Sequence, residues 1–229
     1  MNVKFRKKII CYIIIVISFN CSSIKNHNYE KTLIDIGDSL TAGAGGEGTT
    51  MSNVASRKLP TTYTIKNMGI GGENTLTIGA RQGGIPMYIK ESIIIPSNTT
   101  KVEIPSGVYS SYNNKNILPL SQGFGGFSPN HIKGSGGINP CYIDGIECLL
   151  SKTSGKYFIN RTEISPTDHV TKPNSVIVTS LSKQTEGILT IFIGQNGGYS
   201  SPDDLLKQIN LIVKHKGDKN VIVITSHGN

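Results

Sequence analysis

Four short polar stretches of this chain contain the residue types that nucleophilic catalysis uses. Each follows an apolar run directly, and they are Asp38-Ser39, NMGIGG at 67–72, GQN at 194–196 and SHG at 226–228. Acyl transfer through a covalent intermediate requires a nucleophile, a base for its proton and donors aimed at the developing oxyanion. A serine hydroxyl can be the nucleophile and a histidine the base. An asparagine side chain and the backbone N–H of a glycine can be the donors. Glycine, serine and asparagine are also common in turns, so each stretch taken alone fits a plain turn.

Alternating strands and helices are the elements that must position these stretches. Apolar runs predict strands at residues 31–37, 63–69, 187–194 and 220–226. Helical spacing predicts helices at 51–59 and 201–217, the second beginning with Ser201 as N-cap and Pro202 in the first position. Their expected apolar faces are Met51, Val54, Ala55 and Leu59, and Leu205, Leu206, Ile209, Ile212 and Val213. The order predicts a parallel sheet, whose strands gather their carboxyl ends at one edge.

Residues 86–182 separate the second predicted strand from the third and predict an inserted all-β subdomain. The segment consists of short β-rich runs broken by Gly, Pro, Asn and Ser, without helical periodicity. Asp144-Gly145 is a two-residue hairpin signal, which places Cys141 opposite Cys148 on neighbouring strands. Two buried thiols are the simpler interpretation and a disulfide is the alternative. The cysteines do not have the spacing of a metal site.

Three of the polar stretches, in this order and each at a strand end, resemble the blocks of the SGNH (GDSL-type) hydrolase family. The first block is Gly37-Asp38-Ser39-Leu40, the second is NMGIGG at 67–72, and the third is Gly194-Gln195-Asn196. The resemblance covers residues 33–79 and 187–229. It implies an α/β fold, the flavodoxin-like three-layer SGNH hydrolase sandwich.

The resemblance also implies roles for single residues. Ser39 would be the nucleophile, and its own N–H would be one oxyanion donor. The Gly72 N–H and the Asn196 amide would be the other two donors. The family's reaction needs no metal and no organic cofactor.

The sequence departs from the family pattern in two places. Gly197 stands where the third block usually continues with Asp, and no Asp-x-x-His block, fifth strand or last helix follows Asn196. His227 follows a strand at the correct sheet edge, His215 ends a helix, and the remaining candidates lie in the insertion, namely His131 and His169. We assign the base to none of them. We therefore expect the chain to be a C-terminally incomplete piece of a longer hydrolase.

The N-terminal segment predicts export. Residues 1–20 combine a basic start with a short apolar stretch, which is typical of a signal peptide, and Cys21 lies where a lipoprotein cysteine would be lipidated. An uncleaved anchor is the alternative. Four of the charges behind the net +8 lie in this segment, and no basic run with interleaved aromatics occurs elsewhere, so nucleic acid is not an expected partner. We expect an extracytoplasmic protein held at the membrane by a lipid anchor.

The predicted organisation is a signal peptide, a tether at 21–32, hydrolase core at 33–85 and 183–229, and the β-rich insertion at 86–182. The predicted function is a serine esterase that cleaves acyl or acetyl esters of a small molecule or a carbohydrate. The alternative is a non-catalytic surface lipoprotein whose insertion binds glycan or protein. Four aromatic residues either line a sugar or acyl site or belong to the core, namely Tyr88, Tyr109, Tyr112 and Phe124. The oligomeric state is not predicted.

Overall fold

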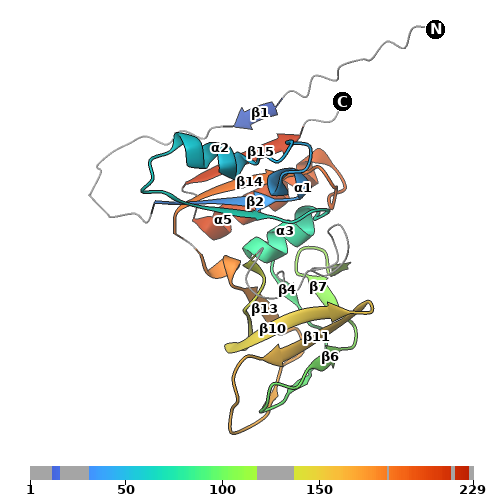
Figure 1. Cartoon of the computed structure of the whole chain (residues 1–229). Helices are drawn as coiled ribbons and strands as arrows, with labels where there is room; N and C mark the ends of the chain where they lie inside the picture. The colour runs from blue at the N-terminus through green and yellow to red at the C-terminus, as the bar shows by residue number, and fades with distance from the viewer. Residues whose placement is uncertain (1–11, 16–30, 118–136, 185, 218–219, 227–229) are drawn as a thin grey trace, which may run out of the picture.

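A parallel sheet with helices on both faces forms one half of the molecule, as the computed structural model in Figure 1 shows. The structure describes residues 12–15, 31–117, 137–184, 186–217 and 220–226. The sheet has the order β1-β15-β14-β2-β3. Its parallel members are β2 (Thr32–Gly37), β3 (Thr64–Gly69), β14 (Ile188–Ile193) and β15 (Val221–Ser226). These four strands and their parallel pairing confirm the parallel sheet predicted from the apolar runs.

The edge beside β15 is occupied by β1 (Tyr12–Ile15), which pairs with β15 in the antiparallel direction. These residues belong to the segment predicted as a signal peptide. Cys21 and the rest of that segment lie outside the described residues. Within the described part of the chain, no helix combines the length and the apolar character needed to cross a bilayer.

In the described part of the chain, four helices cover the sheet: α1 (Ser39–Ala42), α2 (Met51–Lys58), α3 (Thr75–Gln82) and α5 (Pro202–Lys216). Figure 1 shows α1 and α2 on one face, and α3 and α5 on the other. Ile78 of α3 and Ile212 of α5 share one core cluster with the apolar residues of β2 and β14. The connections that follow β2 and β14 therefore place their helices on opposite faces of the sheet.

The two predicted helices are present, but their expected apolar faces are only partly buried. Pro202 begins α5 behind the N-cap Ser201, and Ile212 is buried as expected, whereas Leu206 is 55% exposed. In α2 the prediction is wrong for Val54, which is 43% exposed, while Ser52 is buried. The hydroxyl of Ser52 donates to the buried Asp35 carboxylate of β2, which explains why a polar residue faces the sheet.

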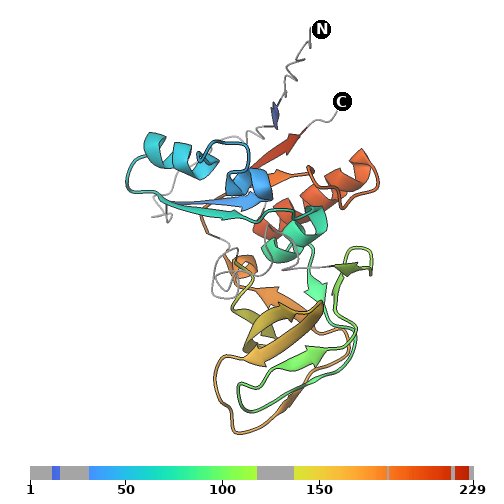
Figure 2. The same ribbon diagram turned by 45° about the vertical axis from the view of Figure 1, so that its right-hand side comes forward.

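An antiparallel sheet forms the other half of the molecule, and Figures 1 and 2 show it on the side of α3 away from β1. Its strands, in spatial order, are β6 (Val102–Ile104), β11 (Lys156–Arg161), β10 (Ile146–Thr153), β9 (Cys141–Ile143), β13 (Val176–Thr179), β4 (Met87–Tyr88), β7 (Val108–Ser110) and β8 (Asn116–Ile117). A separate pair is made by β5 (Ile94–Ile95) and β12 (His169–Val170). The short helix η2 (Leu181–Lys183) leads back to β14. The chain is thus a mixed α/β protein with a parallel sheet and a large antiparallel sheet.

The hairpin between β9 and β10 confirms the turn signal at Asp144-Gly145. Both residues have positive φ, 50° and 84°, as this type of tight turn requires. Cys141 pairs directly with Cys148, and both are free, buried thiols, which confirms the simpler of the two interpretations. Burial raises the pKa of Cys141, and it raises the pKa of Cys148 to about 11.

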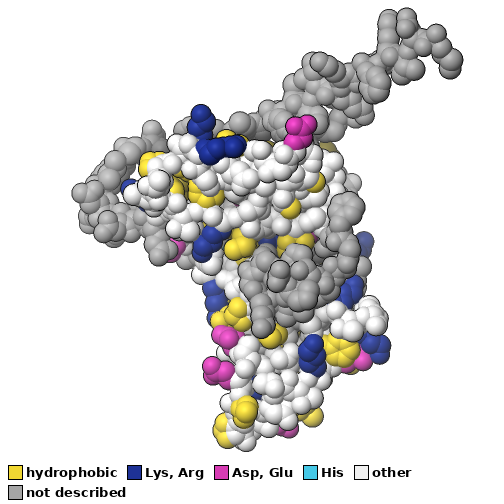
Figure 3. Space-filling model, viewed as in Figure 1, with side chains coloured by type: hydrophobic (Ala, Val, Ile, Leu, Met, Phe, Trp, Pro, Cys, Tyr) yellow, Lys and Arg dark blue, Asp and Glu magenta, His cyan; other side chains and the backbone are white. Residues whose placement is uncertain are grey.

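Figure 3 shows that charged and hydrophobic side chains are interspersed on the face that it displays. Lys and Arg side chains lie over both halves of the molecule, singly or in small groups rather than as one continuous stripe.

Candidate active site

Asp38 and Ser39 lie at the carboxyl end of β2, where the chain turns sharply into α1. Asp38 is the N-cap of α1, and its Oδ1 accepts a hydrogen bond of 2.9 Å from the Leu40 N–H. Ser39 is the first residue of the helix and is half-buried. The turn requires a glycine before it, because a Cβ on Gly37 would lie 2.2 Å from the Thr41 hydroxyl oxygen. The tight turn thus fixes the backbone on which Ser39 stands.

Asn67 and Gly69 at the end of β3 hold α1 against the sheet. The Asn67 side chain donates to the Thr41 carbonyl at 2.8 Å and accepts from the Gly69 N–H at 2.9 Å. A Cβ on Gly69 would lie 2.3 Å from the Ala42 nitrogen, so only glycine permits the helix to approach this closely. Two residues of the second block therefore position α1.

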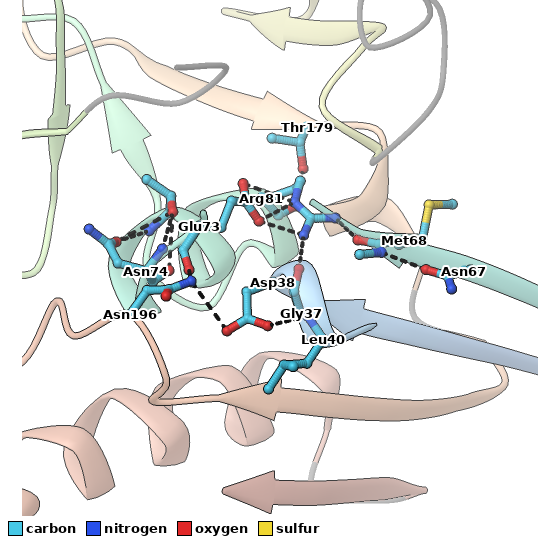
Figure 4. A network of polar contacts seen from close by, with 12 residues as sticks. Gly37, Asp38, Leu40, Asn67, Met68, Glu73, Asn74, Arg81, Thr179 and Asn196 are labelled. Carbon is cyan, nitrogen blue, oxygen red and sulfur yellow. Dashed lines mark hydrogen bonds and ion pairs between the residues drawn. The ribbon is translucent and has the colours of Figure 1, made fainter. Parts of the chain in front are cut away.

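Asn196 joins the loop after β14 to the ends of the other two strands (Figure 4). Its Nδ2 donates to the Glu73 carbonyl at 2.9 Å and to the Asp38 carboxylate at 3.4 Å. Gly72 precedes Glu73 directly; it is exposed and has φ of 79°. The structure therefore brings together the three segments in which the sequence placed site residues, those of Ser39, Gly72 and Asn196.

The loop that carries Asn196 is held on the other side by one hydrogen bond from a backbone N–H and one from a side chain. The Gly197 carbonyl accepts from the Thr75 N–H at 3.0 Å, and the Gly198 carbonyl accepts from the side-chain Nε2 of Gln208 at 3.0 Å. Gly197 has φ of 70°, and a Cβ there would meet no atom within 4 Å. The position where the family usually has Asp is thus open, and α3 and α5 fix the loop through its backbone.

A buried ion pair beneath these loops was not predicted from the sequence. Arg81 of α3 contacts Glu73 at 2.6 Å, with side chains 1% and 3% exposed. The guanidinium also donates to the carbonyls of Met68, at 2.5 Å, and Gly37, at 3.2 Å. A charged residue directly after the glycine block was a signal for a special role of Glu73, but its partner eight positions later was visible only in the fold.

Burial dominates the electrostatics of this edge of the sheet. It raises the pKa of Asp38, partly offset by the hydrogen bond from the Leu40 backbone. It also raises the pKa of Glu73, against which the positive charge of Arg81 acts. Carboxyl groups with raised pKa values, gathered at one edge of a sheet, are typical of functional sites.

Neither described histidine lies beside Ser39. The Nε2 of His169 is 3.1 Å from the Asp144 carboxylate, in the antiparallel half of the molecule. The Nε2 of His215 is 3.0 Å from the Ser182 carbonyl. His131 and His227 lie outside the described residues. Among the described residues, no group of three or more metal-ligating side chains could hold a metal ion.

The aromatic residues of the insertion are divided between two places. The rings of Tyr88 and Tyr109 are 5.9 Å apart on neighbouring strands, and the Lys90 ammonium lies 3.7 Å from the centre of the Tyr109 ring. The hydroxyl of Tyr112 donates to the Asp204 carboxylate in the first turn of α5. Tyr112 thus connects the insertion to the helix that follows the Asn196 loop, and Phe124 lies outside the described residues.

Comparisons with known proteins do not assign this site. No protein-family model, curated protein or solved structure matches the chain. Its chemistry is therefore inferred from the residues and their arrangement.

Proposed function

We propose that the chain is a serine ester hydrolase of the SGNH type, with Ser39 as its nucleophile. The observation that carries the proposal is the pair of hydrogen bonds from Asn196 to Asp38 and Glu73. They place a neutral amide donor and the Gly72 loop beside the turn of Ser39. A nucleophile close to several fixed N–H donors is the arrangement that acyl transfer requires.

The strand order of the parallel sheet supports the same proposal. Numbered in chain order, the four parallel strands are β2, β3, β14 and β15. Across the sheet they follow one another as β3, β2, β14 and β15, which is the order 2-1-3-4. This is the order of the first four strands of a flavodoxin-like sheet. Its active sites lie beyond the carboxyl ends of the strands, where Ser39, Gly72 and Asn196 are found.

In the proposed reaction the Ser39 hydroxyl oxygen attacks the carbonyl carbon of an acyl or acetyl ester. The Ser39 proton passes to a base, and the N–H groups of Ser39 and Gly72 stabilise the oxyanion. The Asn196 amide joins them by turning to the oxyanion the N–H that makes the weaker bond, of 3.4 Å, to the Asp38 carboxylate. The carbon–oxygen bond to the alcohol then breaks, the alcohol leaves with a proton, and water hydrolyses the acyl-enzyme. We place the base outside the described residues, because His169 and His215 are bonded elsewhere. The steps use no metal or organic cofactor.

The β-rich insertion and the N-terminus complete the proposal. We assign selection of the ester, on a small molecule or a carbohydrate, to the insertion, because Tyr112 ties it to the helix behind the Asn196 loop. We further propose that the protein is extracytoplasmic and anchored through lipid on Cys21. Removal of the signal peptide at residues 1–20 would take β1 away from the edge of the sheet beside β15. Incorporation of labelled palmitate that disappears in Cys21→Ser would support the anchor, whereas unchanged incorporation would contradict it.

A binding role without catalysis is the second candidate function. It is favoured by the absence of a histidine beside Ser39 among the described residues, and by the paired tyrosines on the antiparallel sheet. In this case the insertion would bind glycan or protein, and Ser39 would be chemically inert.

A serine-directed fluorophosphonate probe separates the two candidates. The esterase proposal predicts labelling of the full chain that is lost in Ser39→Ala and retained in Ser111→Ala. Ser111 is an exposed serine of the insertion and serves as the matched control. Hydrolysis of a simple acetyl ester should follow the same pattern. A folded chain that shows neither labelling nor hydrolysis would favour the binding role.

A further inference from the structure

The side chain of Arg81 holds several segments of the candidate active site at once. Its Nη2 and Nε bind the Glu73 carboxylate at 2.6 and 3.0 Å. Its two terminal nitrogens also reach the backbone, where they bind the Met68 carbonyl at 2.5 Å and the Gly37 carbonyl at 3.2 Å. Figure 4 shows the guanidinium between the strand ends and the Glu73 loop.

Each of these acceptors is a close neighbour of a proposed catalytic group. Gly37 is two residues before Ser39, and Glu73 follows Gly72 directly. The Glu73 carbonyl, in turn, accepts the 2.9 Å hydrogen bond from Asn196. One guanidinium is thus connected, directly or through Glu73, to the segments that carry all three oxyanion donors.

Core packing alone does not explain a charged pair at this place. Moving an arginine and a glutamate out of water is costly, and apolar side chains of the same volume would fill the space with less penalty. Apolar side chains cannot bind the carbonyls at the ends of two neighbouring strands, whereas the planar fork of arginine can. Glu73 fixes the orientation of that fork through two of its nitrogens.

We propose that Arg81, held by Glu73, is the positioning residue that sets the relative places of Ser39, the Gly72 N–H and the Asn196 amide. This rests on the proposed esterase function for its catalytic consequence, but the positioning itself is measurable without catalysis. The Gly37 carbonyl accepts from both Arg81 and the Ile70 N–H, the latter at 3.0 Å. The Ile70 amide therefore reports on this end of the sheet.

The test compares Arg81→Lys and the near-isosteric Glu73→Gln with the unsubstituted chain by amide hydrogen exchange and NMR. We expect exchange at Ile70 to accelerate about tenfold, the effect of losing one charge-assisted hydrogen bond, and the side-chain resonance of Asn196 to move. The Thr64 amide, bonded to Lys31 at the opposite end of the same strands, should stay unchanged. Arg161→Lys, a buried arginine of the antiparallel half, is the matched control and should change neither signal.

The catalytic consequence is measured with the fluorophosphonate probe on the same variants. We expect the maximal rate of Ser39 labelling to fall roughly 100-fold in Arg81→Lys, with the half-saturating probe concentration nearly unchanged, because the donors are displaced rather than lost. Unchanged Ile70 and Asn196 signals in either folded variant would overturn the positioning role. A chain that is not labelled at all, but shows the expected exchange, would retain the positioning role and refute the esterase.

Discussion

The two halves of the molecule bury different kinds of side chain. In the described part of the parallel half, five charged residues are buried, namely Asp35, Asp38, Glu73, Arg81 and Lys216. In the described part of the antiparallel half, Arg161 is the buried charged residue, and the core is a cluster of mainly aliphatic side chains. The parallel half is thus the one that accepts the desolvation cost of buried charge.

The buried carboxyl groups of the parallel half have pKa shifts in the opposite direction to that of the exposed Asp144 in the antiparallel half. Burial raises the pKa values of Asp35, Asp38 and Glu73 in the parallel half. In the antiparallel half, burial of Asp144 is outweighed by hydrogen bonds from His169 and Ser175, which lower its pKa. The carboxyl groups whose charged form burial disfavours thus lie in the parallel half, and two of them, Asp38 and Glu73, belong to the candidate site.

Removal of one partner of the buried ion pair is the strongest way to test this contrast. Glu73→Ala leaves the Arg81 charge buried and uncompensated, so we expect the free energy of unfolding to fall by about 3–5 kcal/mol. Glu103→Ala breaks the Lys156–Glu103 pair of the antiparallel half, whose side chains are 60% and 38% exposed, and should cost less than about 1 kcal/mol. Urea unfolding of both variants gives the comparison. Equal losses in the free energy of unfolding would mean that the buried pair contributes no more to stability than the exposed pair.

Substitution of two asparagines compares the candidate active site with the antiparallel half. Asn196→Ala removes a proposed oxyanion donor, so we expect ester hydrolysis to fall by about 100-fold or more. Its effect on unfolding should be small, because one side-chain bond of 2.9 Å and a weaker one of 3.4 Å are lost. Acetyl-ester turnover and urea unfolding measure the two effects.

The matched variant for Asn196→Ala is Asn139→Ala in the antiparallel half. Asn139 donates to the Leu150 carbonyl and accepts from the Leu150 N–H, both at 2.8 Å in the core. Its removal leaves both backbone groups unsatisfied, at about 1–3 kcal/mol each, without touching the site. Loss of turnover in the folded Asn139 variant, or unchanged turnover in the Asn196 variant, would contradict the division of roles.

The elements of the parallel half were predictable from the sequence where a strong local signal existed. The four strands are apolar runs, and α5 has a serine N-cap, a proline in the first turn and a C-terminal glycine. Helix α3 was not predicted, because Thr75, Thr77 and Gly79 lower its helix propensity. A Cβ on Gly79 would lie 2.8 Å from the end of the Ile85 side chain, so a larger residue there would require Ile85 to shift.

The candidate site was predictable only in part. Ser39, Gly72 and Asn196 belong to short stretches that can be recognised in the sequence, and the fold brings these stretches together. The pairing of Glu73 with Arg81 was not predictable, because residues eight positions apart become neighbours only when α3 packs under the strand ends. The same reason hid the partners Asp35 and Ser52, which lie on a strand and a helix.

The smallest expected effect concerns the contact that joins the two halves. The pKa of Asp204 is lowered to about 2, first by the hydroxyl of Tyr112 and then by the Ser200 backbone. A lowered pKa contributes stability above the unfolded value of about 3.8, and this contribution is lost as the pH falls through about 2. Tyr112→Phe should therefore raise the pKa of Asp204 and make stability less dependent on pH in this range. Carboxyl NMR titration measures the pKa directly.

The matched control for the tyrosine is Tyr88→Phe, because the Tyr88 hydroxyl binds Asn114 rather than Asp204. It should leave the Asp204 titration unchanged. If the insertion is held to α5 mainly by Tyr112, hydrogen exchange in the first turn of α5 should also rise in Tyr112→Phe and not in the control. An unchanged Asp204 titration in Tyr112→Phe would mean that the hydrogen bonds from Ser200 and Gln208 set its pKa. The two halves would then be joined there by packing and not by this hydrogen bond.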